Sequence, residues 1–193
     1  LSAEDAHHLA DSQTALNPGD IEKFIERAGG NPLFLQQLLR NADQLSANDL
    51  PDSIQGIVQS RLDALPRLDR SMLQTAAVLG QRFSRSALAH LQNDPNATPD
   101  GLLKEALLAD AGDALTFVHA LVRDGAYESL LKTRRIALHQ RAAEWYADID
   151  LALRARHLDR AGDPEAAVAY LAAAERYTAI FEHDRARLLL ERA

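Results

Sequence analysis

The apolar residues of this chain recur at helical spacing along nearly its whole length, and a proline or glycine follows most of these stripes. Over residues 53–65 the apolar side chains lie about one helical turn apart, and Pro66 follows them. Residues 68–79 repeat this arrangement, with Gly80 as the stop signal. Aromatic residues make up only 5% of the chain, and its abundant alanine and leucine favour helices. We therefore expect a mainly α-helical protein.

The first part of the chain, residues 1–46, predicts helices joined by abrupt breaks. One helix is expected over 2–16 and a second over 20–28, with the breaker Asn17-Pro18-Gly19-Asp20 between them. Gly29 and Gly30 stop the second helix, and Pro32 suits the first turn of a third helix because its missing N–H costs nothing there. The polar residues 41–50 then read as a linker.

Residues 51–118 predict a winged-helix-like domain with a very small β element. Ser84 can cap a short helix there, and the β-branched and aromatic run Leu115-Thr116-Phe117-Val118 favours a strand. The expected elements are helices over 53–65, 68–79, 84–91 and 99–108, a turn over 109–113, and a strand over 115–118.

Residues 119–193 predict a helical linker followed by antiparallel helical hairpins. Gly162-Asp163-Pro164 separates a helix over about 150–161 from one over 164–178, and a further helix starts near His183. Small residues on the second helix allow close helix contacts. Hairpins of this kind are the unit of a solenoid, so we expect the start of a tetratricopeptide-like array.

Composition argues against several classes of protein, namely broad nucleic-acid binders, disulfide-linked proteins and membrane-spanning proteins. The formal charge of −7 argues against broad nucleic-acid binding. The absence of cysteine excludes a disulfide framework and thiolate metal sites, and fits a reducing compartment. No apolar run has the length of a membrane span. We expect a cytoplasmic protein without a membrane partner, and the start at Leu1 reads as a segment cut from a longer chain.

No reactive constellation stands out among the polar residues. The phosphate-loop motif is missing, and so is a Gly-x-Ser-x-Gly elbow. The seven histidines lack zinc-helix spacing and are expected at the surface or partly buried. His119 is the most interesting of them, because it lies where it could cap a helix or pack at a domain junction. We expect no catalytic residue, no metal site and no enzyme activity in these 193 residues.

Two charged clusters attract attention. Arg123 and Asp124, with Glu128, predict local ion pairs on a helix face. The run Lys132-Thr133-Arg134-Arg135 is the densest basic stretch. We expect it at the helix end where cations favour the dipole. The alternatives are an anion contact or a surface that docks an ATPase core.

Three stretches together resemble STAND-type signalling ATPases of bacteria. "RAGGNPLFLQQLL" is similar to the segment after their nucleotide-binding core. "LPDSIQGIVQSRLDALPRLDRSMLQTAAVLGQRFS" resembles their winged-helix region, and "FVHALVRDGAYESLLKTRRIALHQRAAEWY" resembles the helices leading into their repeats. The resemblance implies a helical lid over 1–46, a winged helix over 51–118 and repeats from 119. Such chains are often fused to adenylate or guanylate cyclase, kinase or LuxR-type domains.

The resemblance also assigns a role to the Gly-Asn-Pro corner. It implies that Asn31 and Pro32 lie against the base of ATP or ADP, where a rigid proline ring offers an apolar surface. The alternative is a plain helix stop followed by a helix-starting proline. Since the phosphate loop is missing, ATP or ADP is expected as cofactor of the parent protein and not of this segment alone. The expected partners are the upstream nucleotide-binding domain and a protein or ligand on the repeats.

A second reading is a winged-helix DNA-binding protein with a helical dimerisation tail. Its recognition helix would be the predicted helix over 84–91, with Arg82, Arg85 and His90. Residues 51–118 hold six lysines and arginines against eight acidic residues, whereas DNA readers are usually basic. We therefore favour an internal lever over a DNA reader.

Overall fold

A computed structural model describes residues 21, 22, 25, 35, 39, 54–94 and 98–193. The chain divides into two compact units, residues 1–61 and 62–193. In the first unit Ile21, Leu35 and Leu39 are helical and buried. The predicted helix over 2–16 and the linker over 41–50 lie outside the described residues.

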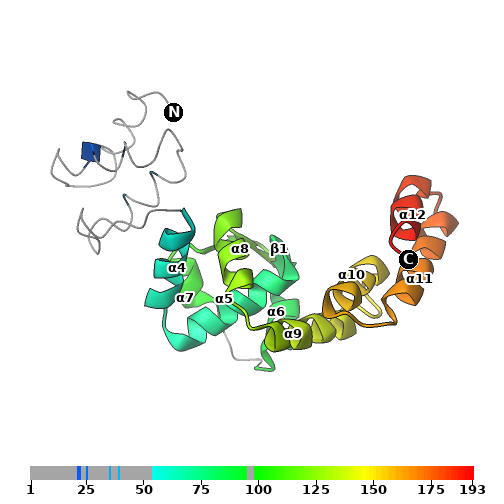
Figure 1. The fold of residues 1–193 in the computed structure, drawn as a ribbon, viewed down its shortest axis with the longest axis horizontal. Helices are drawn as coiled ribbons and strands as arrows, with labels where there is room; N and C mark the ends of the chain where they lie inside the picture. The colour runs from blue at the N-terminus through cyan, green and yellow to red at the C-terminus, as the bar shows by residue number, and fades with distance from the viewer. Residues whose placement is uncertain (1–20, 23–24, 26–34, 36–38, 40–53, 95–97) are drawn as a thin grey trace. The chain divides into compact units, whose positions relative to one another are not determined.

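Four helices and three short strands make up the region from 54 to 117 (Figure 1). The helices are α4 (Ile54–Ala64), α5 (Arg67–Leu79), α6 (Arg85–Gln92) and α7 (Asp100–Lys104). The strands are β1 (Arg82–Ser84), β2 (Leu108–Ala111) and β3 (Ala114–Phe117). The helices predicted over 53–65, 68–79 and 84–91 are thus confirmed, and Ser84 Oγ accepts a capping bond from the Ala87 N–H at 3.1 Å.

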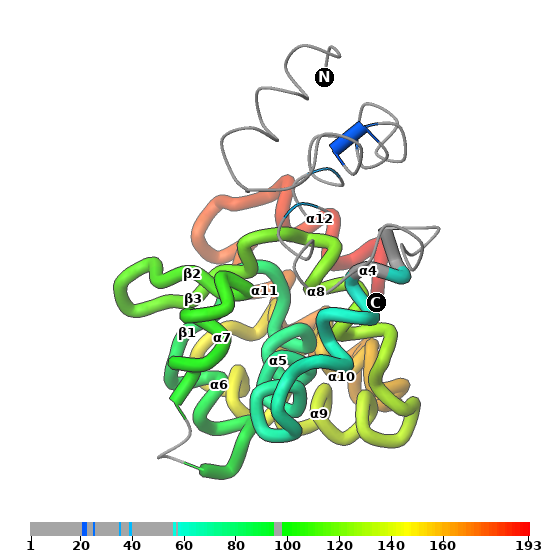
Figure 2. The backbone as a smooth tube through the Cα atoms, turned by 90° about the vertical axis from the view of Figure 1, so that its left-hand side faces the viewer, coloured from blue at the N-terminus to red at the C-terminus, as the bar shows by residue number. Residues whose placement is uncertain are grey.

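The three strands form an antiparallel sheet in the order β1-β3-β2 (Figure 2). Phe83 pairs with Leu115, and Asp110 pairs with Leu115 from the other side. Gly112, at a φ of +79°, and Asp113 close the β2–β3 hairpin as a two-residue loop. The rings of Phe83 and Phe117 lie 5.9 Å apart in the core beneath the sheet.

Two predictions in this region were wrong. The helix expected over 99–108 ends at Lys104, and Ala106 takes a left-handed φ of +51°. The turn expected over 109–113 is confined to Gly112 and Asp113, because Leu108–Ala111 pairs with β3. β1 was not predicted at all. In each case pairing with β3 decides the structure, and the local propensity of three or four residues does not reveal this pairing.

Five further helices follow the sheet along the chain. They are α8 (Ala120–Glu128), α9 (Lys132–Trp145), α10 (Leu151–Ala161), α11 (Ala166–Ala179) and α12 (His183–Leu190). α8 packs on α5, α9 contacts both α5 and α6, and each helix from α10 onward packs on the one before it. Ala155, Ala173 and Ala174 are buried at these contacts. The mainly helical fold with a small sheet and helical hairpins is therefore confirmed.

The ends of α10 show how the hairpins are delimited. Asp150 Oδ1 accepts bonds from the N–H groups of Ala152 and Leu153, both at 3.0 Å. Gly162 ends the helix in the left-handed conformation, at a φ of +69°. Among the described residues, no helix is both long and apolar enough to cross a membrane. The predicted domain boundaries near 46, 51 and 118 stay predictions.

Candidate functional site

Asn31 and Pro32, to which the family resemblance assigns a nucleotide contact, lie outside the described residues. Their role therefore stays a prediction. The site described below is instead the meeting point of α8, α9 and α10, where the basic run and two histidines come together.

The basic run lies at the first turn of α9, not at a C-terminal helix end as predicted. Leu131 is the N-cap residue and offers no side-chain bond to the helix. Cations there face the positive end of the helix dipole, which is unfavourable. The Arg134 guanidinium instead donates to Ser71 Oγ at 2.7 Å, and that of Arg135 donates to the Leu130 carbonyl at 3.1 Å. These contacts fix α9 against α5 and the end of α8.

Two guanidinium groups lie over the ring of Tyr127, which comes from α8. The central carbon of Arg135 is 4.6 Å from the ring centroid, and that of Arg160 is 5.8 Å from it. Arg160 also donates an N–H to the Tyr127 hydroxyl at 3.4 Å. Cation–π attraction favours this arrangement. Tyr127 thus holds together cationic residues from α9 and α10.

The Tyr127 hydroxyl continues inward to a buried pair of histidines. It lies 2.9 Å from His139 Nε2, and His139 Nδ1 lies 2.9 Å from His157 Nδ1. The exposed fractions of His139 and His157 are 0% and 1%. The expectation of surface or partly buried histidines is wrong for this pair. Their positions coincide with the apolar stripes of α9 and α10 beside Ala142 and Leu158, a signal that could have identified them.

The short contact between the two Nδ1 atoms requires one of them to donate and the other to accept. If His139 Nδ1 donates, then His139 Nε2 accepts from the Tyr127 hydroxyl, which accepts in turn from Arg160. Among the nitrogen and oxygen atoms of the Tyr127, His139 and His157 side chains, only His157 Nε2 is then buried without a hydrogen-bond partner. Both rings are neutral in such an arrangement, because a protonated ring would need acceptors on both nitrogens.

The environment favours the neutral form of both histidines. Burial, together with the nearby His157, Arg160, Arg135 and Arg156, lowers the pKa of His139 to about 3. Burial, with Arg156 and Arg160, lowers the pKa of His157 to about 4. The ring of Tyr146 stacks on His157 at a centroid distance of 5.5 Å. The contact between the two rings joins α9 to α10. Because the pair is closed to solvent, it does not present a general base to a substrate.

The next residues that the sequence analysis named are His119 and the charged group Arg123, Asp124 and Glu128. His119 occupies the N-cap position of α8 but makes no side-chain capping bond, so the capping alternative is wrong. Arg123 and Asp124 form the predicted ion pair at 2.6 Å. Among the described residues, Glu128 makes no ion pair.

The candidate DNA-reading helix is α6. Arg85 pairs with Asp110 of β2 at 2.5 Å. The His90 ring lies 5.0 Å from the Trp145 ring, and the backbone carbonyl of His90 accepts a hydrogen bond from the Arg141 guanidinium at 2.6 Å. Arg82 is exposed in β1. The C-terminal end of α6 is thus occupied by contacts with α9.

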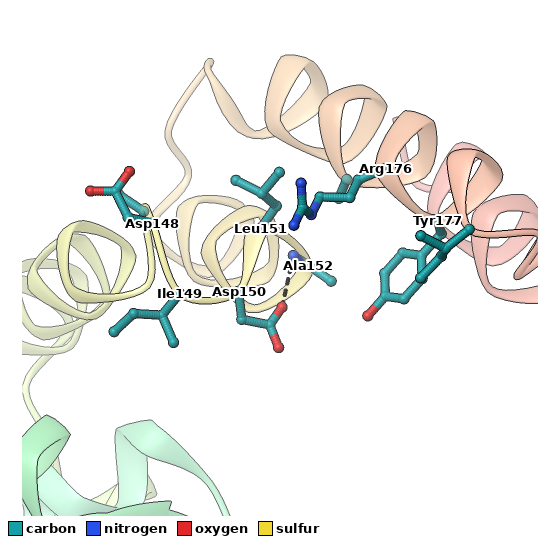
Figure 3. A pocket seen from close by; sticks show the side chains of 10 residues that line it. Asp148, Ile149, Asp150, Leu151, Ala152, Arg176 and Tyr177 are labelled. Atoms are coloured by element: carbon teal, nitrogen blue, oxygen red, sulfur yellow. Dashed lines mark hydrogen bonds between the residues drawn. The ribbon is translucent and has the colours of Figure 1, made fainter.

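A groove of about 400 Å³ lies beside α10, between the α9–α10 connection and α11 (Figure 3). Asp148 and Asp150 come from the connection, and Arg176 and Tyr177 come from α11. Ile149 is 62% exposed. In the described ranges, no group of three or more potential ligands could hold a metal ion. The groove offers apolar and charged contacts to a ligand.

Comparisons with known proteins give one structural neighbour. No family model matches the chain, and no curated protein matches it. A solved structure, the signal transduction ATPase with numerous domains (STAND) protein with a tetratricopeptide repeat sensor from Pyrococcus horikoshii, is similar at a TM-score of 0.55 and 16% sequence identity. The match covers 100% of this chain and 35% of that one. At this identity the likeness shows a shared fold, and this chain spans about a third of its neighbour's length.

Proposed function

We propose that this chain is a regulatory region of a STAND-type signalling ATPase. It would comprise the end of the nucleotide-binding domain's lid, a winged-helix lever and the start of the sensor repeats. The observation that carries this proposal is the fold shared over the whole chain with a STAND protein that has a tetratricopeptide repeat sensor. The order of elements supports it, because a winged helix leads directly into helical hairpins.

The contacts of α9 support a lever mechanism. This helix packs on α5 and α6 of the winged helix and on α10 of the hairpins. Arg134 bonds Ser71 of α5, Arg141 bonds the His90 carbonyl of α6, and His139 bonds His157 of α10. A rotation of the winged helix would therefore carry the first hairpin with it. Rigid packed elements of this kind transmit a displacement between sites.

The nucleotide sets the lever in this proposal. Asn31 and Pro32 contact the base, and the ADP state holds the winged helix against the upstream nucleotide-binding domain of the same chain. Exchange to ATP, or a ligand or protein on the repeats, releases it and activates a fused effector such as a nucleotide cyclase or a transcription regulator. The described chain supplies no catalytic residue, and the protein acts in the cytoplasm.

DNA binding through α6 is the second candidate, because the winged-helix arrangement is common to DNA readers. The side chains favour the lever, since Asp110 pairs with Arg85 and Trp145 contacts His90. A gel-shift assay on random duplex at low salt separates the two, because phosphate contacts dominate under those conditions. Binding that disappears in the variant Arg82→Gln/Arg85→Gln would favour the DNA reader.

Calorimetric titration of ATP and ADP tests the proposed function. The titration compares this chain with a longer one that includes the preceding domain. We expect binding only by the longer chain, and weaker binding after Pro32→Ala. Pro18→Ala in the same segment is the matched control and should bind normally. Equal affinity of the Pro32→Ala and Pro18→Ala variants would contradict a role of Pro32 at the base.

A further inference from the structure

We propose that Arg135, Arg156 and Arg160 form a docking site for the carboxylates of an acidic segment of a partner protein. We call these three residues the arginine cluster. The inference is independent of the proposed function, because it rests only on side chains of α8, α9 and α10.

The arginine cluster comes together through two helices and one tyrosine. Arg135 and Arg160 both lie over the Tyr127 ring, at 4.6 and 5.8 Å from its centroid to the guanidinium carbons. Arg156 precedes Arg160 by one turn on α10, and residues four apart share a helix face. All three act on the buried His139 as nearby positive charges. The cluster is therefore a local concentration of cations and not three scattered residues.

No carboxylate of the described chain neutralises the cluster. Ion pairs within the described residues involve Arg70, Arg85, Arg123, Arg154 and Arg185, and none involves the cluster. The first turn of α9 adds the positive end of its dipole and the charges of Lys132 and Arg134. These positive charges repel one another, and a bound anion would stabilise them.

The geometry favours carboxylates on a protein segment. A guanidinium binds a carboxylate through two parallel N–H bonds, and stacking on an aromatic ring limits its motion before binding. Arg156 and Arg160 are exposed and project from successive turns of α10. Two acidic residues one turn apart on a partner helix match that spacing. Duplex DNA is a poorer match, because the chain's net charge of −7 repels a polyanion of that size.

Fluorescence anisotropy with a labelled acidic peptide tests the site. The probe is a helical peptide with glutamates four residues apart, and a peptide with glutamine at those positions is its control. We expect the glutamate peptide to bind and the glutamine peptide not to bind at about 50 mM salt, where charge contacts are weakly screened. The ring signals of His139 in NMR spectra should shift on binding, because the peptide's charges approach the cations that surround it.

A matched pair of variants separates the site from the overall charge. Arg156→Gln/Arg160→Gln removes two exposed cations of the cluster and leaves Arg135 in place. Arg187→Gln/Arg192→Gln removes two exposed cations near the C-terminus, so the net charge changes equally. We expect about a tenfold loss of peptide affinity in the first variant only. Circular dichroism melting curves check that both variants fold.

Three results would overturn the proposal. The first is equal affinity of the two double variants for the glutamate peptide, which would indicate non-specific attraction. The second is binding of inorganic phosphate with the affinity of the peptide, which would indicate a small-anion site. The third is tighter binding of random duplex DNA than of the peptide, with the same loss in Arg156→Gln/Arg160→Gln, which would indicate a nucleic-acid surface.

Discussion

The Nδ1 atoms of His139 and His157 lie 2.9 Å apart, although one residue belongs to α9 and the other to α10. Both side chains are fully buried, and Tyr127 of α8 completes the contact from the other side of His139. These three side chains join α8 and α9, which pack on the winged helix, to α10, which begins the first helical hairpin. Its energetics therefore measure how firmly these two parts of the chain are coupled.

Replacing both histidines should cost less stability than the sum of the two single replacements, because each single variant leaves the other ring without its hydrogen-bond partner. His139→Leu leaves the Tyr127 hydroxyl and His157 Nδ1 without their partner, and we expect a loss of about 2–3 kcal/mol in the free energy of unfolding. The double variant His139→Leu/His157→Leu should cost at least about 1 kcal/mol less than the sum of the single variants. Urea unfolding of the four proteins gives these values. Additive costs would show that the two rings do not depend on each other.

The same pair should make stability depend on pH. Both pKa values are lowered in the folded chain, from an ordinary 6.5 to about 3 for His139 and about 4 for His157. Below pH 6.5 the unfolded chain therefore binds more protons than the folded one, and acid favours unfolding. The contribution is fully present above pH 6.5 and decreases as the pH falls, by up to about 1.4 kcal/mol per pH unit for each histidine.

Urea unfolding at pH values from 5 to 7.5 measures this dependence. The control is the variant His139→Leu/His157→Leu, which keeps every carboxylate of the chain. Its stability should change less between pH 6.5 and pH 5 than that of the unaltered protein. The same slope in both proteins would mean that the two histidines are not held neutral.

The N-terminal cap of α10 gives a prediction about stability. Asp150 and Asp148 both line it, but only Asp150 bonds the helix N–H groups. Asp150→Ala should lower the free energy of unfolding by about 1 kcal/mol, and Asp148→Ala by less than about 0.5 kcal/mol. Asp150→Asn should retain most of the stability, because its amide oxygen can accept the same bonds. Equal effects of the two alanine variants in a denaturant titration would contradict the capping role.

The stop after α10 depends on backbone conformation. Gly162 has a φ of +69°, and a Cβ added there would meet no atom within 4 Å. Gly162→Ala should therefore cost about 1 kcal/mol through the left-handed conformation alone. Gly162→Asn should cost less, because asparagine adopts this conformation readily, as Asn93 does in this chain at a φ of 57°. Thermal melting of both variants tests the order, and a larger loss in Gly162→Asn would indicate a steric cause.

The sequence predicted those elements whose signals are local. Ser84 caps α6 and Gly162 ends α10 because a hydroxyl acceptor and a left-handed glycine act on their own turn of the chain. β1 and β2 could not be predicted in the same way. They have three and four residues, too few for their type to be read from periodicity, and both become strands by pairing with β3. The partner of β1 is distant in sequence, whereas β2 pairs with β3 across a two-residue loop.

The site was predictable only in part. The basic run was singled out, but it was assigned to the wrong kind of helix end, because no glycine or proline marks the break between α8 and α9. The histidine pair was missed, since the contact joins residues 18 positions apart and requires the packing of α9 on α10. The apolar stripes around His139 and His157 were visible in the sequence, whereas their pairing was not.

The measurement that tests the lever most directly is hydrogen–deuterium exchange of the parent protein with ADP and with a non-hydrolysable ATP analogue. Residues 67–117 would pack on the nucleotide-binding domain in the ADP state and separate from it in the ATP state. We expect slower amide exchange in this range with ADP, at sites facing the core. Identical exchange over 67–117 in two states that both contain bound nucleotide would contradict the account.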